Sequence, residues 1–418
     1  MNRFVVGLDL GTNFVRVVIG EVSEEGVLEI IGTAKRPSSG LRNGVIVNRE
    51  NTMECIKSVI EEAEQNAGYE VVSCVTAIGG SQIESLNSTG LVAISSHGRG
   101  EREITKSDVD RVLENATAIQ IPIDRKILHL IPQNYIVDGQ SDYKNPVNII
   151  GVRLEAEVHI VTASKTSVQN LMACVERSGY QLDNVMLKTL ACTSAVMCDE
   201  ERELGSILID LGGSTTDVLV IINDAPVLTV SIPVGGNLVT NDIAIVKGVS
   251  PVTAENLKIE CGCCWIPMID NDDEIIIPGV GGRNPEVTSK SELCQIIQPR
   301  MEEIFSMVRD EVIQRSNLTQ LSGNIILTGG GAMMEGAVEL AQEIFKTSAV
   351  RIGIPSDFGG LQEEYRRADF ATAIGLVLEQ MKVNSKLNKK ERRKDRDASK
   401  TSDKDFLTGL KKIFTKFF

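Results

Sequence analysis

The sequence predicts an α/β protein built from two similar domains, and two short loops are the main reason. Residues 7–13 and residues 208–217 each begin with an apolar run that is typical of a strand and then turn on glycine. Each loop places an Asp, Asp9 or Asp210, at the end of that run and a hydroxyl residue just beyond it. Aromatic residues make up only 4% of the chain and glycines number 36, which favours α/β units rich in tight turns.

The first loop is typical of a phosphate-binding turn, because backbone N–H groups can approach a phosphate closely at glycine and hydroxyls add donors. We expect its N–H groups and Thr12 to meet a phosphate. Arg16, on the returning strand, would add positive charge. Taken alone, the loop also fits an ordinary β-hairpin.

The second loop is more specific because it combines two glycines with three hydroxyl side chains. These residues are Gly212, Gly213, Ser214, Thr215 and Thr216. Two such loops suggest two domains that face each other across one nucleotide. The two loop aspartates suit a hydrated Mg²⁺, which keeps most of its waters and takes few carboxylates.

The first domain is expected to open with a hairpin of strands at 4–10 and 14–20, because both runs are apolar around a tight turn. A helix follows at 51–66, with Asn51 or Thr52 as its N-cap and Gly68 after its end. Further strands are expected at 27–31, 71–78 and 185–188, and a further helix at 166–178.

Residues 82–162 change in character, with short strand-like runs, one helix at 106–118 and no phosphate loop, so we expect a small inserted subdomain. The second domain then repeats the opening of the first, and this echo supports duplication. Its expected strands are 205–210, 218–223, 227–232 and 324–328, and its helices 237–247, 251–259, 297–315 and 336–345. Residues 262–292 look irregular, and the last helix of the folded body is expected at 368–380.

Three other motifs each fit more than one interpretation. Gly329 and Gly330 could pass beneath an adenosine or simply join a strand to a helix. Glu255 and Lys258 share one helix face and fit either ribose and base contacts or a solvated surface pair. The Cys run at 261–264 indicates zinc only weakly, because adjacent thiols constrain the geometry badly and no second Cys pair or His lies near in sequence.

Charge is distributed unevenly along the chain. The net charge is −14, yet residues from Lys386 onward hold 12 Lys/Arg against 5 Asp/Glu, a net +7, so the preceding 385 residues carry −21. An acidic body is a poor partner for nucleic acid, whereas a basic tail indicates an anionic membrane surface. We expect no signal peptide and, with nine cysteines in no regular framework, reduced thiols in the cytosol.

The last 14 residues, 405–418, combine apolar side chains at helical spacing with lysines on or beside the polar face. The residues expected to meet a membrane are Phe406, Leu407, Leu410, Lys411, Lys412, Ile413, Phe414, Lys416, Phe417 and Phe418. The segment is too short to span a bilayer and is typical of an interfacial helix, the alternative being a helix docked on its own domain. Residues 385–404 are charged and without apolar anchors, which predicts a disordered linker.

With these residues assembled, the chain resembles the FtsA family of bacterial cell-division proteins, within the actin-like ATPase superfamily. The resemblance covers nearly the whole length and rests on both loops, on residues 233–244, 254–258 and 328–331, on the insertion and on the basic tail. It implies an actin-like two-domain ATPase fold with an inserted small α+β subdomain, a disordered linker and a C-terminal amphipathic helix. ATP and Mg²⁺ are the implied cofactors.

The resemblance also implies site residues. Those expected at the nucleotide are Gly11, Thr12, Asn13, Arg16, Gly212, Gly213, Ser214, Thr215, Gly235, Gly236, Glu255, Lys258, Gly329 and Gly330. Asp9 and Asp210 would hold Mg²⁺ through water. Within this set Gly235 and Gly236 would line the cleft, Glu255 and Lys258 face the ribose and adenine, and Gly329 and Gly330 lie beneath the adenosine.

The implied domain map has nine segments, because each large domain is assembled from stretches that are separate in the sequence. The first domain comprises 1–81, 164–194 and a helix at 361–384, and the inserted subdomain is 82–163. The second domain comprises 195–234 and 321–360, with its upper subdomain at 235–320. The linker at 385–404 and the membrane helix at 405–418 complete the chain.

The implied function is an ATP-binding protein that polymerises on the cytoplasmic face of the membrane at the division septum, as a peripheral protein. It would anchor filaments of FtsZ there and recruit later division membrane proteins. Arg300 is the expected contact for the acidic and apolar C-terminal tail of FtsZ. The alternatives are an actin-like adaptor of a pilus or secretion assembly and a small-molecule kinase of the same superfamily.

One position departs from the superfamily pattern. Actin-like hydrolases often carry Glu or Gln followed by Pro before a small-residue helix, and that residue helps to position the attacking water. Here the sequence reads Lys188-Thr189. A Lys accepts no proton from water unless its pKa is strongly lowered, so we expect at most slow ATP turnover, with ATP acting mainly as a structural ligand.

Overall fold

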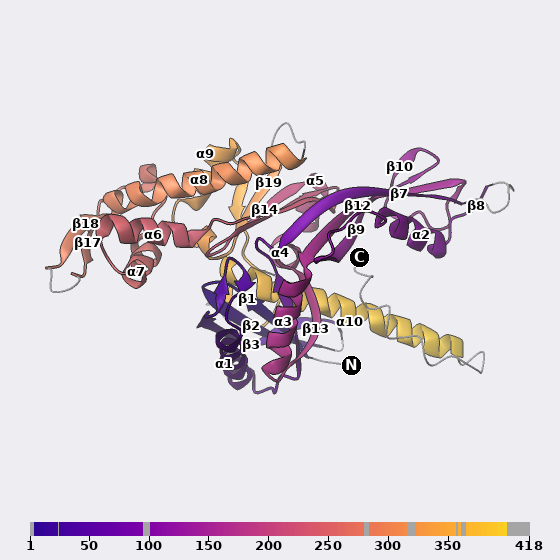
Figure 1. Cartoon of the computed structure of the whole chain (residues 1–418), viewed down its shortest axis with the longest axis horizontal. Coiled ribbons are helices and arrows are strands. Elements are labelled where there is room, and N and C mark those ends of the chain that lie inside the picture. Colours follow the sequence, from indigo (N-terminus) through magenta and orange to yellow (C-terminus); the bar gives the residue numbers. More distant parts are fainter. Residues whose placement is uncertain are drawn as a thin grey trace.

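Two five-stranded sheets with the same strand order form the centre of the molecule (Figure 1). The computed structural model describes residues 4–23, 25–94, 101–279, 284–316, 323–356, 358–360 and 365–398. In each sheet three consecutive strands form an antiparallel meander, and two later strands extend the sheet in parallel from the first of them. The predicted α/β class is confirmed, and the second sheet repeats the first.

The first sheet has the order β13-β6-β1-β2-β3 and the second the order β16-β15-β14-β19-β20. The strands of the first are β1 Phe4–Leu10, β2 Phe14–Val22, β3 Leu28–Pro37, β6 Ser73–Ile78 and β13 Gln181–Leu187. Those of the second are β14 Ser206–Leu211, β15 Thr216–Ile222, β16 Ala225–Ile232, β19 Asn324–Thr328 and β20 Val350–Ile352. The two-residue strands β4 Leu41–Arg42 and β5 Val45–Ile46 pair with each other beside the first sheet.

Helices cover both faces of the first sheet, which is why its central strand is buried almost throughout. On one face α1, Arg49–Ala67, packs Ile56 against Leu8 of β1. On the other face α10, Ala371–Ala398, packs against Val5, one of the alternate residues of the same strand. Helix α3, Lys165–Arg177, packs beside α1 and β13 in the first domain, and the short helices α4 Lys188–Val196 and α5 Asp199–Leu204 then lead to the second domain.

The inserted subdomain lies at one end of the molecule, beyond both sheets (Figure 1). Its sheet has the order β10-β9-β12-β7, and α2 packs on that sheet. The elements are β7 Ile83–Ala93, α2 Lys106–Ala116, β9 Arg125–Val137, β10 Gln140–Tyr143 and β12 Arg153–Ser164, with β8 Arg102–Glu103 paired to β11 Ile150–Gly151. Its hydrophobic core is separate from those of the two larger sheets.

The upper region of the second domain corrects one expectation. Residues 262–292, expected to be irregular, contain β17 Glu274–Ile277 paired antiparallel with β18 Glu286–Ser289. The alternation is easily missed because the strands are short: Ile275 and Ile277 point inward while Ile276 is exposed. The helices of this region are α6 Gly236–Lys247, α7 Pro251–Cys261 and α8 Lys290–Ser316, with a 3-10 turn at Ile266–Met268. After β19 come a 3-10 turn at Gly330–Met333 and α9 Ala337–Phe345, and a last 3-10 turn, Ala368–Phe370, leads into α10.

The predicted disorder of the linker at 385–404 is wrong for residues 385–398, which continue α10 (Figure 1). The buried first turns of α10 nucleate the helix, and Lys, Arg and Glu then extend it because their helix propensity is high. Residues 399–404 and the whole amphipathic segment 405–418 lie outside the described residues. Among the described helices, none is both long and apolar enough to cross a membrane.

Candidate functional site: a cleft between two matching hairpins

The two predicted loops are the turns of two matching hairpins. In the first, the Gly11 N–H donates to the Phe14 carbonyl at 3.1 Å, and in the second the Gly212 N–H donates to the Thr215 carbonyl at 2.9 Å. The strand register then places Asp9 opposite Arg16 and Asp210 opposite Asp217. The structure therefore supplies two copies of one turn, each with an Asp two residues before it begins.

The two hairpin turns touch across the cleft. The Thr12 and Ser214 hydroxyl oxygens are 2.7 Å apart. Asn13 and Asn237 exchange two side-chain hydrogen bonds, one donated by Asn13 at 2.7 Å and one by Asn237 at 3.1 Å. The first turn thus contacts the second turn through Ser214 and the start of α6 through Asn237. A triphosphate placed between the turns must break these contacts.

The second turn is fixed to the start of α6. The Gly236 N–H donates to the Gly212 carbonyl at 3.0 Å, and the Asn237 N–H donates to the Gly213 carbonyl at 2.7 Å. Gly235 is needed for this approach, because a Cβ there would lie 2.6 Å from the Gly212 carbonyl oxygen. The predicted cleft residues Gly235 and Gly236 therefore stand against the second hairpin turn.

Glu255 and Lys258 of α7 also reach this place. The Lys258 ammonium contacts Glu255 at 2.6 Å, the Thr240 hydroxyl at 2.9 Å and the Gly236 carbonyl at 3.2 Å. Both polar side chains are partly buried, so the interpretation as a solvated surface pair is wrong for Lys258, whose side chain is 11% exposed. This network connects α7 to the start of α6 at the wall of the cleft.

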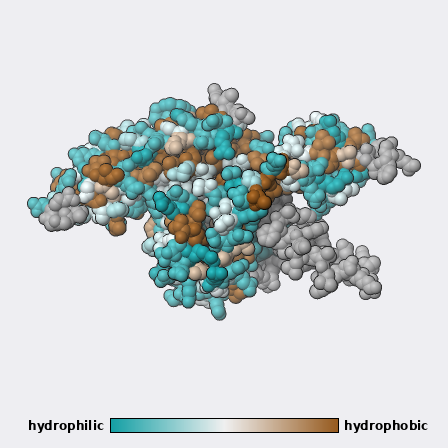
Figure 2. Space-filling view, viewed as in Figure 1, coloured by the Kyte–Doolittle hydropathy of each residue, from teal (hydrophilic) through white to brown (hydrophobic). Residues whose placement is uncertain are grey.

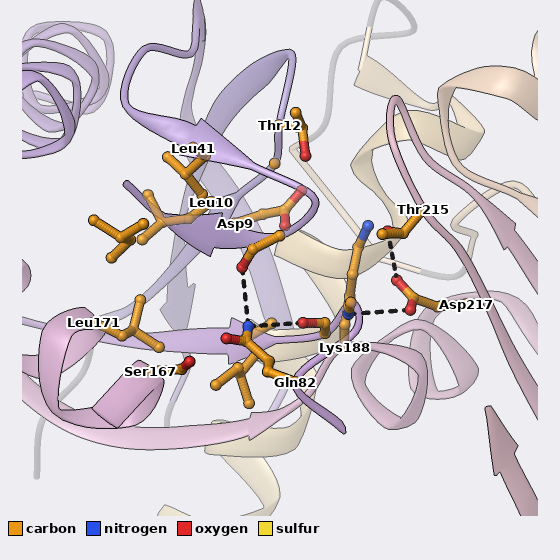
Figure 3. A pocket seen from close by; sticks show the side chains of 17 residues that line it. Asp9, Leu10, Thr12, Leu41, Gln82, Ser167, Leu171, Lys188, Thr215 and Asp217 are labelled. Carbon is orange, nitrogen blue, oxygen red and sulfur yellow. Dashed lines mark hydrogen bonds between the residues drawn. The ribbon is translucent and has the colours of Figure 1, made fainter. Parts of the chain in front are cut away.

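Three charged side chains, Asp9, Lys188 and Asp217, line the pocket in Figure 3, and Lys188 also contacts a fourth, Asp210. Lys188 Nζ lies 2.8 Å from Asp210 Oδ2, although the approach is not aligned as a hydrogen bond. Figure 3 shows Lys188 extending into the pocket with Asp9 on one side and Asp217 on the other. The Lys188 side chain is 18% exposed and that of Asp210 only 2%.

Burial and mutual charge act in opposite directions on this cluster. Burial disfavours the charged form of Lys188, but the carboxylates of Asp210, Asp9 and Asp217 outweigh it and raise the lysine pKa. Burial raises the pKa of Asp9 and of Asp217, and in both cases Lys188 partly offsets the rise. Lys188 is thus a firmly protonated cation, and the acids depend on it.

Arg16 points away from the predicted phosphate site. Its Nη2 donates to Asp369 at 2.9 Å, and its Nη1 lies 3.8 Å from Asp9. Lys35 donates to the same Asp369 oxygen at 2.8 Å. Although burial alone would raise it, the pKa of Asp369 falls to about 2 because Arg16 and Lys35 surround the carboxylate. Arg16 is therefore committed to an ion-pair cluster under the first loop.

Gly329 lies directly behind Asp210. Its φ is +82°, and its Cβ, if present, would overlap Asp210 Oδ1 and stand 2.7 Å from the Leu211 carbonyl. Gly330, the next residue, has open space around it. Of the two glycines predicted to lie beneath an adenosine, Gly329 therefore packs against Asp210 and Leu211, whereas Gly330 has open space beside it.

The donors present fit a phosphate chain better than a resident Mg²⁺. Backbone N–H groups and hydroxyls of two turns face one cleft, and Lys188 adds a positive charge. The place between Asp9 and Asp210 expected for Mg²⁺ is the place of the Lys188 ammonium, so the described arrangement does not fit that ion. Within the described ranges no group of three or more His, Cys, Asp or Glu is arranged to hold a metal, the Cys run at 261–264 included.

Most of the residues that line the pocket were absent from the predicted site, and three of them matter for its polar chemistry: Gly80, Lys188 in a binding role, and Asp217. Asp217 accepts a hydrogen bond from the Gly80 N–H at 3.1 Å and so joins the second domain to the end of β6 in the first. The double glycine after an apolar strand, at 79–80, was the signal available in the sequence.

Arg300, the predicted partner contact, lies on α8 and is already paired. Its Nε and Nη2 bind the two carboxylate oxygens of Asp242 on α6 at 2.7 and 3.1 Å, and its Nη1 binds Glu303. An incoming carboxylate must therefore compete with Asp242 and Glu303 for this guanidinium.

Two family models match the chain. The one described as "Cell division protein FtsA" matches residues 207–375, and the one described as "SHS2 domain inserted in FTSA" matches residues 80–162. Among curated relatives, "Cell division protein FtsA" of Borreliella burgdorferi is 44% identical over 404 residues, covering 95% of this chain and 97% of that protein. The Pseudomonas aeruginosa protein of the same name is 40% identical, covering 90% and 89%, and that of Escherichia coli 36%, covering 90% of each.

Solved structures agree on the architecture. A "PilM-PilN type IV pilus biogenesis complex" superposes with a TM-score of 0.64 at 17% identity, covering 90% of this chain and 97% of that chain. "MreB5 of Spiroplasma citri bound to ADP" superposes with a TM-score of 0.55 at 16% identity, covering 93% and 99%. These likenesses show the fold, which is the predicted actin-like one. From the sequence relatives it follows that the chain belongs to the FtsA family of cell-division proteins.

Proposed function

We propose that this member of the family is an ATP-binding scaffold that polymerises on the cytoplasmic face of the cell membrane and anchors FtsZ filaments during septum formation. It recruits later division membrane proteins to the same place. The observation that carries the proposal is the pair of matching turns that face each other across one cleft. Membership of a cell-division family argues against the pilus-adaptor and kinase alternatives.

ATP lies between the two turns in this proposal. Gly11, Thr12 and Asn13 face its phosphates from one side and residues 212–215 from the other, with Lys258 and Gly330 towards the nucleoside. Any Mg²⁺ in the site is carried in by the ATP phosphates, because Lys188 takes the place beside Asp210 that was expected for the ion. Because Lys188 replaces a water-positioning carboxylate or amide, ATP serves mainly as a structural ligand that favours the filament.

The membrane contact is the C-terminal segment 405–418. Each large side chain that enters the membrane contributes on the order of 1.5–3 kcal/mol, and helix folding offsets much of the sum. One copy therefore binds weakly, while a filament that carries many copies binds firmly. This links nucleotide-dependent polymerisation to membrane attachment.

The direct test is electron microscopy of the purified full chain on anionic lipid monolayers, with and without ATP, beside a truncation that ends at Lys404. We expect ATP-dependent filaments on the monolayer with the full chain and none with the truncation. A monolayer of neutral lipid is the matched control for the basic tail. If ATP is bound yet no condition gives filaments, the scaffold proposal is wrong.

The FtsZ contact has its own test, because Arg300 is held by Asp242. Exposed apolar side chains on the neighbouring helices, such as Ile245, Val252 and Ile259, offer contacts for the apolar portion of an acidic tail. Figure 2 shows apolar side chains along the part of the second domain formed by α6, α7 and α8. We expect Arg300→Ala to weaken binding of a synthetic FtsZ tail peptide, and Asp242→Asn to strengthen it by releasing the guanidinium. If both variants bind the peptide with the affinity of the wild-type chain, the peptide does not bind at Arg300.

A further inference from the structure

We propose that Lys188 is a built-in cation of the nucleotide site, which contacts the phosphates of bound ATP and makes ATP binding nearly independent of Mg²⁺. This inference rests on the proposed ATP binding and goes beyond it by naming the group that replaces the metal. Its origin is the mismatch between the expected Mg²⁺ position and the ammonium that stands there.

The position of Lys188 in the fold explains why its side chain reaches this point. It is the first residue of α4 and follows the end of β13, the strand beside β6. The ends of β1, β6 and β13 lie at the same edge of the first sheet, so a side chain there points at the hairpin turns. Gly79, just after the end of β6, stands close to both the Lys188 side chain and Asp217.

The contacts of Lys188 bridge the two domains. Lys188 follows the last strand of the first sheet, and its ammonium lies 2.8 Å from Asp210 of the second domain. Its side chain lines the same pocket as Gly11, Thr12 and Thr215. The phosphate-facing turns and the ammonium therefore open on the same space, as the close-up in Figure 3 shows for Thr12, Lys188 and Thr215. A phosphate placed between the turns is within reach of this charge.

The charge balance requires a cation at this point. Three buried carboxylates, Asp9, Asp210 and Asp217, stand together, and Arg16 is shared between Asp9 and Asp369. Lys188 is the ammonium that faces all three. A buried carboxylate cluster without a cation is strongly unfavourable, so removal of Lys188 creates a demand for another positive ion.

The chemistry of an ammonium also differs from that of the ion it replaces. It donates hydrogen bonds but has no lone pair to orient a water and no bound water to activate. It can hold phosphates in place without supplying a nucleophile. ATP would then be bound tightly and cleaved slowly, with turnover below about 1 s⁻¹, under the median enzyme rate of roughly 10 s⁻¹.

The test measures affinity of the full chain for a fluorescent ATP analogue in excess EDTA and in millimolar MgCl₂. The variants are Lys188→Gln, Lys188→Arg, and Lys346→Gln as a matched control at an exposed lysine. Wild type, K188R and K346Q should bind with similar affinity in both buffers. K188Q should lose about 10- to 100-fold in EDTA, the factor for one hydrogen bond to a charged group, and recover most of it with Mg²⁺.

A second readout uses Mg²⁺ alone, without nucleotide. The thermal midpoint of K188Q should rise with MgCl₂ as the ion enters the acidic cluster, whereas wild type should not respond. Wild-type binding that is lost in EDTA would overturn the inference while leaving ATP binding intact, and this result needs no variant to fold. If wild type binds no ATP in either buffer, the proposed function fails, and this inference with it.

Discussion

The two hairpins of the molecule share one topology and one turn, but they differ in the residue that faces the loop aspartate. Asp9 faces Arg16, whereas Asp210 faces a second acid, Asp217. The first half therefore supplies a cation of its own, Arg16, which Asp9 shares with Asp369, and Lys188 adds to it. The second half takes its cation from the connecting helix, through Lys188. The two hairpins share their backbone arrangement and differ in their charges, so the connection between the halves, which carries Lys188, belongs to the site.

The largest expected effect of a single substitution tests the half that contains Arg16. Asp369→Ala leaves Arg16 and Lys35 partly buried without their shared carboxylate. We expect a loss of about 3–5 kcal/mol in the free energy of unfolding, measured by urea denaturation. Glu61→Ala, which removes an exposed pair with Lys57, should cost less than about 1 kcal/mol. Equal costs would show that the cluster is not a structural charge pair.

Acid should loosen the inserted subdomain from both halves. His129 accepts a hydrogen bond from the Leu187 N–H of the first half at 2.9 Å, and His159 bonds Thr229 of the second at 2.9 Å. Burial lowers the pKa of each to about 4, below the ordinary 6.5. The contribution of the two neutral histidines to the free energy of unfolding is therefore fully present above pH 6.5. It falls as the pH drops towards 4, by about 1.4 kcal/mol per pH unit for each histidine.

Protonation affects the hydrogen bonds of the two histidines differently. Protonation removes the acceptor on His129 altogether, whereas Thr229 can still accept from a protonated His159. His129→Gln and His159→Gln should each reduce the slope of the unfolding free energy against pH by about 1.4 kcal/mol per pH unit, which is the slope for one proton. An unchanged slope in both variants would mean that other groups set the acid sensitivity.

A glycine pair tests the floor behind Asp210. Gly329→Ala forces a side chain onto Asp210 at a φ of +82°, so we expect a loss of about 1–3 kcal/mol in stability, together with weaker ATP binding. Gly330→Ala enters open space and should stay within about 0.5 kcal/mol of wild type. Similar values for the two variants would contradict the described packing at this turn.

The smallest expected effect is at the contact between the halves. A double-mutant cycle of Asn13→Ala and Asn237→Ala should give a coupling of about 0.5–1.5 kcal/mol without nucleotide, because the two amides exchange hydrogen bonds. The coupling should disappear in saturating ATP, when the turns have separated. Zero coupling without ATP would mean that the halves do not meet in solution.

Local patterns predicted the elements of this molecule better than its charge pairs. The hairpins were visible because an apolar strand, a glycine turn and a returning strand are contiguous. The partner of Arg16 lies 353 residues away, so nothing near Arg16 indicates that its guanidinium is directed at Asp369. Lys188 stands out in the sequence as a departure from a pattern, but its contact with Asp210 depends on packing between domains. The extension of α10 past residue 385 was missed because polar composition was given more weight than helix propensity.

The most direct measurement is ATP binding by a Thr12→Cys/Ser214→Cys variant before and after oxidation, with each single variant treated identically to account for native thiols. The hydroxyl oxygens at these positions are 2.7 Å apart, so a disulfide would lock the two turns together. We expect the reduced protein to bind ATP, the oxidised protein to lose binding, and reduction to restore it. Unchanged ATP affinity in the locked protein would show that the nucleotide does not enter between the hairpins.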